Sequence, residues 1–344
     1  MKKNSTLPIL LFAAVFCMLF ACSKINLIKK ATTTSGLNWT QAASLSSSTV
    51  HKLAVSGSTV YAASSTGLYS STNNGSTWTL VGGGLPTGVD FNNIAVNGSN
   101  IYVASSNGLY YSTNSGTSWT ATTSSSIALA VALAVSGNNL FASDFGYGVS
   151  LSTDNGSSWT TVNSGLPSNG SVLSLTASGS NIFAGVFINN GTGGAPGTTI
   201  YLSTNNGSSW TALSTGLPPV ANLNALTVNG NTLYAGILGY TSADVSSGSG
   251  IYLSTNNGST WAAVGGSGLP SSLFNTVSLA TSGSNIFAGF AFSGVYRSTN
   301  NGSTWTKEGN ALTGDVTPGC IVIVGNTIII GDGFNTGGIY TATF

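Results

Sequence analysis

The sequence predicts an all-β protein whose single main domain is a seven-bladed β-propeller of four-stranded antiparallel blades. Three observations predict this fold. An eight-residue phrase occurs six times, seven tryptophans follow one another at intervals of 39 to 51 residues, and short strand-like runs recur between them in a constant order. Four short strands in a period of about 40 residues are typical of a propeller blade.

The repeated phrase, Ser-x-Asn/Asp-x-Gly-x-x-Trp, predicts a hairpin turn between the third and fourth strands of a blade. Five copies have Asn-Gly at the centre, as in Asn74-Gly75, and both residues tolerate the positive φ of such turns. We expect the Asn or Asp side chain to cap the backbone of the turn and the Trp to pack between neighbouring sheets. The structural residues of the six turns are Asn73, Trp78, Asn114, Trp119, Asp154, Trp159, Asn205, Trp210, Asn256, Trp261, Asn300 and Trp305.

Strand-like runs surround each turn in the same order. The first blade has a predicted inner strand at residues 51–55 and a second strand at 59–62. In the next blade, the alternating run at 108–112 predicts a third strand, and the run that begins at Trp119 predicts a fourth.

The two ends of the propeller sequence predict how the ring closes. Residues 36–40 contain Trp39 and resemble the end of a repeated phrase without its beginning. Residues 338–344 form a third strand that stops where a phrase would begin. We therefore expect the N-terminal strand to complete the C-terminal blade, which leaves no open sheet edge.

The first 35 residues predict export. Lys2 and Lys3 precede an apolar run, residues 7–21, that is shorter than a membrane-spanning helix and typical of a signal peptide. Residues 19–22, Leu-Phe-Ala-Cys, resemble a bacterial lipobox, which implies cleavage before Cys22 and acylation of that residue. The expected organisation is a signal peptide (1–21), a lipidated tether (22–35) and the propeller (36–344). We expect a lipid-anchored protein of the bacterial cell envelope, in the outer membrane on its periplasmic side or at the cell surface; a secreted protein without lipid is the alternative.

Charge and composition exclude several classes of function. Without residues 1–21 the chain has six basic and seven acidic residues, so it lacks the basic surface that nucleic-acid binding requires. Cys320 lies in an apolar run and is expected to be a buried thiol with no disulfide partner. We find no pattern of metal ligands, and we expect a monomer without cofactor, metal or nucleic acid.

The repeated phrase resembles the Asp-box, or BNR repeat, of sialidases, sortilin-type receptors and Ycf48-like photosystem assembly factors. Ser71, Asn73, Gly75 and Trp78 match that pattern, and the other five copies match it equally well. The Asp position holds Asp only at Asp154 and Asn elsewhere, which keeps the hydrogen-bonding role and removes the charge. The resemblance implies a propeller whose boxes are structural turns distant from the active site, and it carries no catalytic residue.

The loops that join strands two and three, and each blade to the next, are expected on the face opposite the boxes. Two long insertions, at residues 187–199 and 239–250, fall in such loops, and loops that lengthen on one face of a rigid ring are common binding sites. Most acidic residues and several aromatic residues fall in the same loops. The candidate ligand-binding residues are Asp90, Phe91, Asp144, Phe145, Tyr147, Tyr240, Asp244, Asp315, Asp332 and Phe334.

These observations predict a non-catalytic module that binds a glycan or another envelope protein. By the family resemblance a sialidase would need three arginines and a Tyr-Glu pair, whereas the chain has one arginine, Arg297, and one glutamate, Glu308. Two alternatives stay open: a glycoside hydrolase or lyase that uses loop carboxylates such as Asp144 and Asp332, and an assembly factor similar to the Ycf48-like proteins. The only histidine, His51, is expected to be structural.

Overall fold

The computed structural model describes residues 36–124, 127, 129–144, 146, 148–188, 197–213, 215–218, 221–239, 250–264, 267–270, 276–309, 312, 316–334 and 337–344. Ser35–Phe344 forms one compact unit. The predicted signal peptide, Cys22 and the tether lie outside the described residues. Within the described ranges, no helix has the length and hydropathy needed to cross a bilayer.

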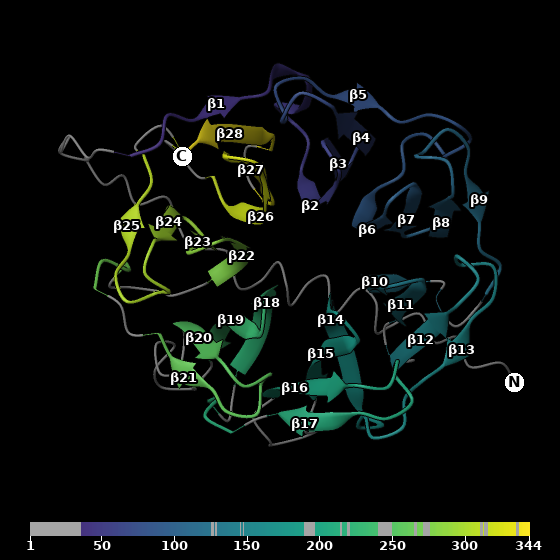
Figure 1. Cartoon of the computed structure of the whole chain (residues 1–344). Coiled ribbons are helices and arrows are strands. Elements are labelled where there is room, and N and C mark those ends of the chain that lie inside the picture. Colours follow the sequence, from purple (N-terminus) through teal and green to yellow (C-terminus); the bar gives the residue numbers. More distant parts are fainter. Residues whose placement is uncertain are drawn as a thin grey trace, which may run out of the picture. The chain divides into compact units, whose positions relative to one another are not determined.

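The described residues form seven four-stranded antiparallel sheets, which we number as blades one to seven (Figure 1). Blades one to three are β2 (Val50–Ser56), β3 (Thr59–Ser64), β4 (Gly67–Ser71) and β5 (Thr79–Leu80); β6 (Phe91–Asn97), β7 (Asn100–Ser105), β8 (Gly108–Ser112) and β9 (Thr120–Ala121); and β10 (Ala130–Ser136), β11 (Asn139–Asp144), β12 (Gly148–Ser152) and β13 (Thr160–Thr161).

Blades four to six continue the same order. They are β14 (Gly170–Ser178), β15 (Asn181–Ile188), β16 (Gly197–Ser203) and β17 (Thr211–Leu213); β18 (Ala221–Asn229), β19 (Thr232–Gly239), β20 (Gly250–Ser254) and β21 (Ala262–Ala263); and β22 (Thr276–Ser282), β23 (Asn285–Phe290), β24 (Gly294–Ser298) and β25 (Thr306–Lys307). Part of the predicted insertion at 187–199 is therefore strand, because β15 and β16 pair as far as Ile188 and Gly197.

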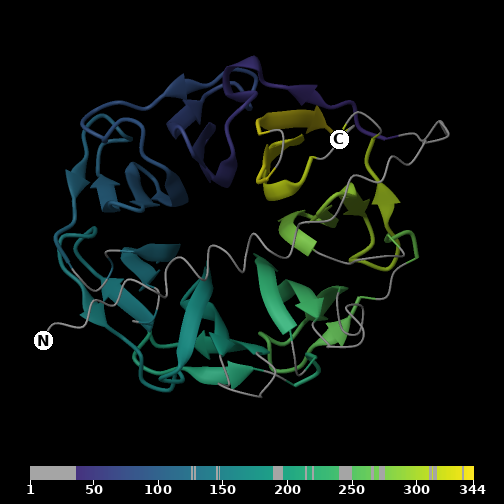
Figure 2. The ribbon, with the colours of Figure 1, turned by 180° about the vertical axis from the view of Figure 1, so that it is seen from behind.

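Blade seven closes the ring. It contains β26 (Pro318–Val324), β27 (Thr327–Asp332), β28 (Ile339–Thr343) and β1 (Thr40–Gln41), and a short 3-10 helix, η1 (Ala43–Leu45), leads from β1 toward blade one. The strand β1 pairs with β28 through Thr40 opposite Thr341 and Gln41 opposite Tyr340. The predicted closure by the N-terminal strand is confirmed, and blades one and seven stand side by side in both views of the ring (Figures 1 and 2). Because β1 covers β28, the outer edge of blade seven is paired like that of every other described blade.

The core lies between consecutive sheets rather than inside any one of them. Tyr61 and Leu68 of blade one, for example, pack against Phe91 and Ile101 of blade two. The tryptophan of each repeated phrase belongs to such an interface, as Trp78 does where it packs with Ile329 of blade seven. Loss of one ring of this size is expected to cost roughly 3–5 kcal/mol.

The repeated turns are held by hydrogen bonds within a few residues of sequence. In the first turn the Gly75 N–H donates to Ser71 Oγ at 2.9 Å, and Ser71 Oγ donates to Asn73 Oδ1 at 2.9 Å. The Thr77 N–H donates to the same Oδ1 at 3.0 Å, and Asn74 and Gly75 have φ of 54° and 81°. Asp154 makes the corresponding bonds in the third turn, which lower the pKa of its carboxyl to about 2, chiefly through the Ser158 hydroxyl and N–H. The predicted capping role of the Asn/Asp position is confirmed.

Cys320 is buried in blade seven, as the apolar run predicted. Its Sγ lies 3.7 Å from the carbonyl oxygen of Val50, and burial raises the pKa of the thiol to about 12. The thiol is therefore protonated and unreactive at neutral pH.

Candidate ligand-binding face

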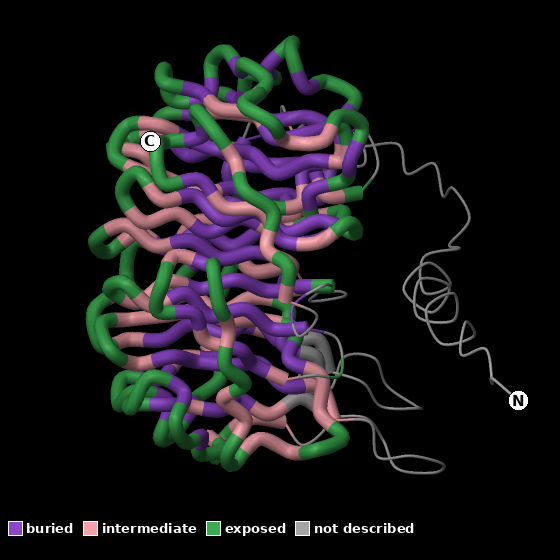
Figure 3. Tube along the Cα trace, turned by 90° about the vertical axis from the view of Figure 1, so that its right-hand side faces the viewer, coloured by how far each residue is buried: buried purple, intermediate pink, exposed green. Residues whose placement is uncertain are grey.

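The antiparallel order gives the ring two chemically different faces. The turns between strands one and two and the repeated turns between strands three and four lie on one face, which we call the turn face. The connections between strands two and three, and between one blade and the next, lie on the other, which we call the loop face. In side view, buried segments run along the strands between two rims of exposed residues (Figure 3).

Each innermost strand carries a β-bulge close to its start, at the end nearest the loop face. A bulge leaves one residue out of the ladder and re-aims its side chain. The residues skipped in the register are His51, Asn92, Val131, Leu173, Asn224, Val277 and Gly319. All seven are at least partly exposed, and His51 is the one ionisable residue among them. The bulges therefore place a set of mainly neutral groups along the innermost strands at their loop-face ends.

Asp90 and His51 form a pair on this face. Asp90 directly precedes β6, and its Oδ1 lies 2.9 Å from His51 Nε2, which makes an ion pair when the imidazole is protonated. The Asp90 side chain is 54% exposed and that of His51 29% exposed. His51, which we expected to be structural, thus contacts Asp90, a predicted ligand-binding residue in the connection between blades one and two.

Asp144 and Asp332 do not lie in loops, so their predicted placement was wrong. They are the last residues of β11 and β27, opposite Ala130 and Pro318, and they are 2% and 0% exposed. The Leu129 N–H donates to Asp144 Oδ2 at 2.8 Å, and the Thr317 N–H donates to Asp332 Oδ1 at 3.1 Å. Each carboxylate thus holds the segment that enters the innermost strand of its own blade, and a substrate would have to displace these bonds to reach it.

Of the predicted aromatic residues that the structure describes, one is buried and one is exposed. Phe91 is 1% exposed and packs edge-on to Tyr110 at 6.4 Å between ring centroids, so its ring belongs to the core and is closed to a ligand. Phe334 is 43% exposed on the loop face, and its N–H donates to Asp332 Oδ1 at 3.2 Å. Five predicted site residues lie outside the described residues: Phe145, Tyr147, Tyr240, Asp244 and Asp315.

The sequence reasoning missed Phe292. This residue lies between β23 and β24 on the loop face, is 55% exposed, and has a φ of 58°, which is uncommon for a bulky side chain. Strained residues of this kind often occur at functional sites. The sequence Phe290-Ala-Phe-Ser-Gly indicates this exposure. Phe292 directly precedes a Ser-Gly turn, where the strand has ended and no neighbouring strand can cover its ring.

The loop face also contains a cleft of about 300 Å³ between blades three and four. Its lining residues are Gly146, Gly148, Asn163, Leu166, Pro167, Ser168, Gly170 and Val186. The Val149 N–H donates to Asn163 Oδ1 at 2.7 Å, and a Cβ on Gly148 would lie 2.4 Å from the same oxygen, so this wall depends on a glycine. None of the lining residues is ionisable, and the cleft suits a neutral group that is partly apolar.

The single arginine and the single glutamate lie where blade six meets the N-terminal segment. The Arg297 guanidinium donates to Asn285 Oδ1 at 2.8 and 3.0 Å, and it lies 4.9 Å from the ring centroid of Phe344. Glu308 is buried, which raises the pKa of its carboxyl, and its Oε2 accepts the Leu37 N–H at 3.2 Å. Among the described residues no group of three or more His, Cys, Asp or Glu could hold a metal ion.

Comparison with known proteins identifies a family that matches the chain and solved structures that share its fold. Residues 73–285 match the family described as DUF6242 beta propeller domain. No curated protein matches the chain.

Several solved structures share the fold. Ycf48 bound to a D1 peptide has a TM-score of 0.66 at 13% identity, over 91% of this chain and 98% of that chain. The GH74 xyloglucanase of Xanthomonas campestris has a TM-score of 0.68 at 17% identity, over 89% and 53%. An extracellular domain from B. thetaiotaomicron, described as part of a one component system, has a TM-score of 0.66 at 14% identity, over 90% and 40%. The chain thus spans about half or less of the last two proteins, and identities this low show the fold alone.

Proposed function

The chain belongs to the DUF6242 β-propeller domain family, and on this premise we propose that it is a non-catalytic binding module that holds a peptide segment of another envelope protein on the loop face. One observation carries the proposal. Among the described residues, five large hydrophobic side chains are exposed, and four of them, Leu129, Leu173, Phe292 and Phe334, lie on the loop face. Aromatic side chains are enriched, and charged side chains depleted, at the core of protein interfaces.

The neutral chemistry of the loop face agrees with this function. Six of the seven bulge residues carry no ionisable group, and the cleft between blades three and four carries none. The His51–Asp90 pair then supplies one polar contact on this mainly neutral face. Ycf48, which shares the fold, was solved with a D1 peptide bound, so a propeller of this kind is able to hold a peptide.

A glycan on the same face is the second candidate. The cleft between blades three and four favours it, because Asn163 and Ser168 bring amide and hydroxyl groups beside Leu166 and Pro167. GH74 enzymes share the fold as well. A hydrolytic function has less support, because the two carboxylates proposed for it, Asp144 and Asp332, are buried and bonded to backbone N–H groups.

Two finer assignments belong to the same proposal. The repeated turns are of the Asp-box type, supported by two bonds that recur in all six copies: the Ser hydroxyl oxygen accepts from the Gly N–H, and the Asn or Asp oxygen accepts from the Ser hydroxyl. The protein is anchored to the envelope through lipid on Cys22, supported by the basic residues and the apolar run that precede Cys22 and by the lipobox-like Leu-Phe-Ala-Cys that ends at it.

The function is tested by selecting peptides from a displayed library on the immobilised protein and measuring their affinities by calorimetry. We expect Phe334→Ala and Phe292→Asn to weaken a selected peptide about tenfold or more, as loss of an interface anchor does. Leu80→Ala is the matched control, because Leu80 is equally exposed but lies on the outer strand β5. Equal weakening by all three variants would place the peptide elsewhere.

The glycan and enzyme alternatives are tested together. The wild-type protein is incubated with neutral polysaccharides while binding and released reducing sugar are both measured. Binding that is lost in Phe334→Ala, without sugar release, would replace the peptide by a glycan. Sugar release that disappears in Asp144→Asn would overturn the proposal of a non-catalytic module.

A further inference from the structure

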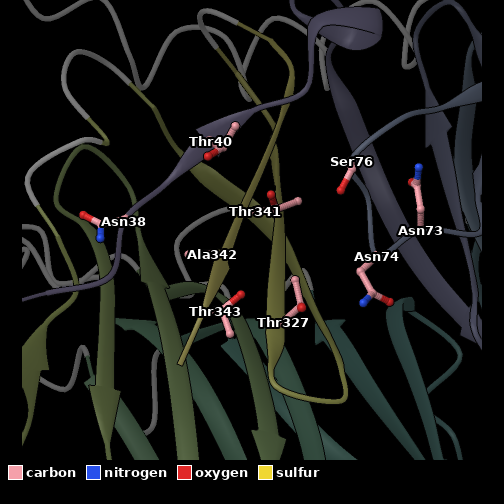
Figure 4. Close-up of a pocket in the computed structure, with 9 residues that line it drawn as sticks. All are labelled: Asn38, Thr40, Asn73, Asn74, Ser76, Thr327, Thr341, Ala342 and Thr343. Carbon is pink, nitrogen blue, oxygen red and sulfur yellow. The ribbon is translucent and has the colours of Figure 1, made fainter.

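The turn face contains a second cleft, at the place where the first repeated turn meets blade seven. Its volume is about 300 Å³. Three segments that are far apart in sequence line it, as Figure 4 shows: the chain around β1, the first repeated turn, and strands β27 and β28. The lining residues are Asn38, Thr40, Asn73, Asn74, Ser76, Thr327, Thr341, Ala342 and Thr343. The cleft exists only because the ring closes between blades seven and one.

The lining of this cleft is polar and neutral. Eight of the nine lining residues carry an amide or a hydroxyl group, and none is ionisable. The Asn73 amide is already engaged within its own turn, with Thr77 and Ser71. In the part of the chain that the structure describes, no hydrogen bond uses the side chains of Asn74, Ser76, Thr327 or Thr341. A ligand with several hydroxyl groups would find both donors and acceptors here, whereas a charged ligand would find no counter-ion.

The corresponding place between blades two and three is bridged by side chains. Asn100 Nδ2 and the Tyr102 hydroxyl of blade two donate to Asn155 Oδ1 of the third turn at 2.9 and 3.2 Å. The Tyr111 hydroxyl lies 3.3 Å from Ser157 Oγ. Blade two therefore bridges to the third turn through three side chains.

Blade seven has shorter residues in the same three places. By register, Thr327, Ile329 and Thr341 correspond to Asn100, Tyr102 and Tyr111. In the described part of the chain, Asn74 and Ser76, the corresponding turn residues, consequently have no side-chain hydrogen bond to blade seven. The place that Ile329 occupies holds an aromatic residue in each of the other six blades, namely Tyr61, Tyr102, Phe141, Phe183, Tyr234 and Phe287.

The first repeated turn packs closely on blade seven at this cleft. A Cβ on Gly75 would lie 2.9 Å from Thr341 Cγ2, so the turn packs closely on blade seven. Asn74 is held at a φ of 54° by the bond from the Gly75 N–H to Ser71 Oγ. Groups held in place before binding lose little conformational freedom when a ligand arrives.

We infer that this cleft is a binding site for one neutral sugar unit. A volume near 300 Å³ is at the lower end of the range for ligand pockets, about 300–1,000 Å³, so a single sugar ring fits better than a chain. Asn74 and Ser76 contact the sugar from the turn, and Thr327 and Thr341 contact it from blade seven. This site is independent of the peptide-binding loop face and lies on the opposite side of the ring.

The test uses saturation-transfer NMR with glucose, galactose and N-acetylglucosamine, and with glucuronate and glucosamine as charged analogues. We expect transfer to at least one neutral sugar and none to the charged ones. Thr341→Tyr should fill the cleft and weaken binding at least tenfold, and the fold accepts tyrosine at this place because Tyr111 lies against Gly156 in the same way.

A second variant keeps the test decisive if Thr341→Tyr folds poorly. Asn74→Gly removes the amide but keeps the positive φ at low cost, and it should also weaken the sugar at least tenfold. Asn206→Gly makes the same change in the fourth turn, away from the cleft, and should leave binding unchanged. Absence of transfer to every neutral sugar, or binding that survives both cleft variants, would overturn the inference.

Discussion

Trp39 Nε1 donates a hydrogen bond to the carbonyl oxygen of Glu308 at 3.1 Å, so the start of the propeller sequence is attached to the end of its sixth blade. A Cβ on Gly309 would lie 2.3 Å from the Leu37 carbonyl oxygen and 3.0 Å from the Trp39 ring, which shows how closely the two segments pack. Residues 36–41 therefore contribute directly to closure of the ring, in addition to the packing between blades seven and one.

Replacement of Trp39 should test that closure directly. We expect Trp39→Ala to lower the free energy of unfolding by roughly 3–5 kcal/mol, because a large ring leaves the interface between blades six and seven. Trp39→Phe keeps most of the ring and loses the indole donor, so it should cost only about 1 kcal/mol. Urea unfolding of both variants is the measurement. Small and equal losses in the free energy of unfolding would show that the packing of Trp39 between blades six and seven contributes little.

The carboxylates at the ends of β11 and β27 should stabilise the folded state. Asp332→Ala leaves the Thr317 and Phe334 N–H groups without their acceptor, and we expect a loss of about 1–3 kcal/mol. Asp144→Ser should cost less, because Ser64 and Ser105 occupy the same register position in blades one and two. Chemical denaturation measures both losses. Unchanged stability in Asp332→Ala would contradict the structural role.

Asp154 should make stability depend on pH in one narrow range. Its bonds to Ser158 and Ser152 lower the pKa of the carboxyl to about 2, below the ordinary value of 3.8. A lowered pKa stabilises the folded state above the ordinary value, and this contribution is lost as the pH falls through about 2. The melting temperature of the wild type should therefore fall more than that of Asp154→Asn between about pH 4 and pH 2.

The comparison with Asp154→Asn also removes the effect of Glu308. The pKa of Glu308 is raised, so its contribution to stability is lost as the pH rises, which is the opposite direction. Both proteins share that contribution, and it cancels in the difference. At pH 7 the two should be nearly equally stable, because the other five turns already use Asn. A gap at pH 7 that stays constant down to pH 2 would contradict the assignment.

Phe290 and Phe292 should respond oppositely to replacement although only Ala291 separates them. Phe290 is buried, with its ring 5.3 Å from that of Tyr296, and Phe290→Ala should cost about 3–5 kcal/mol. Phe292 is exposed at a φ of 58°, a conformation that Asn adopts more readily, and Phe292→Asn should change stability by no more than about 1 kcal/mol. Thermal unfolding of the two variants is the measurement. A large loss in Phe292→Asn would show that this ring serves packing rather than binding.

Much of the fold could be predicted because its signals are local. The bonds in each repeated turn connect residues no more than four apart, from Ser71 to Gly75 for example, so the pattern Ser-x-Asn-x-Gly contains the whole turn. The spacing of the tryptophans then sets the number of blades, and the incomplete phrase around Trp39 indicates which strand closes the ring. These features need no knowledge of which side chains meet in space.

The candidate site was predicted less well because burial depends on neighbouring strands. Asp144 and Phe91 were both assigned to the binding face, yet one ends β11 under the segment that carries Leu129 and the other faces Tyr110. Phe292 was missed although it is more exposed than either. A sequence pattern indicates roughly where a strand ends and a loop begins. Only the strand register decides whether a residue at that boundary is buried or exposed.

By itself, the sequence determined the all-β class, the number of blades, the turn chemistry and the closing strand, because each follows from hydrogen bonds and spacing within one repeat. Only the tertiary structure decided which carboxylates are buried, which aromatic rings reach the loop face, and that Asn74 faces Thr327 and Thr341 across a cleft. The physical reason is that exposure and cavities arise from packing between blades, and residues that are hundreds of positions apart become neighbours only when the ring closes.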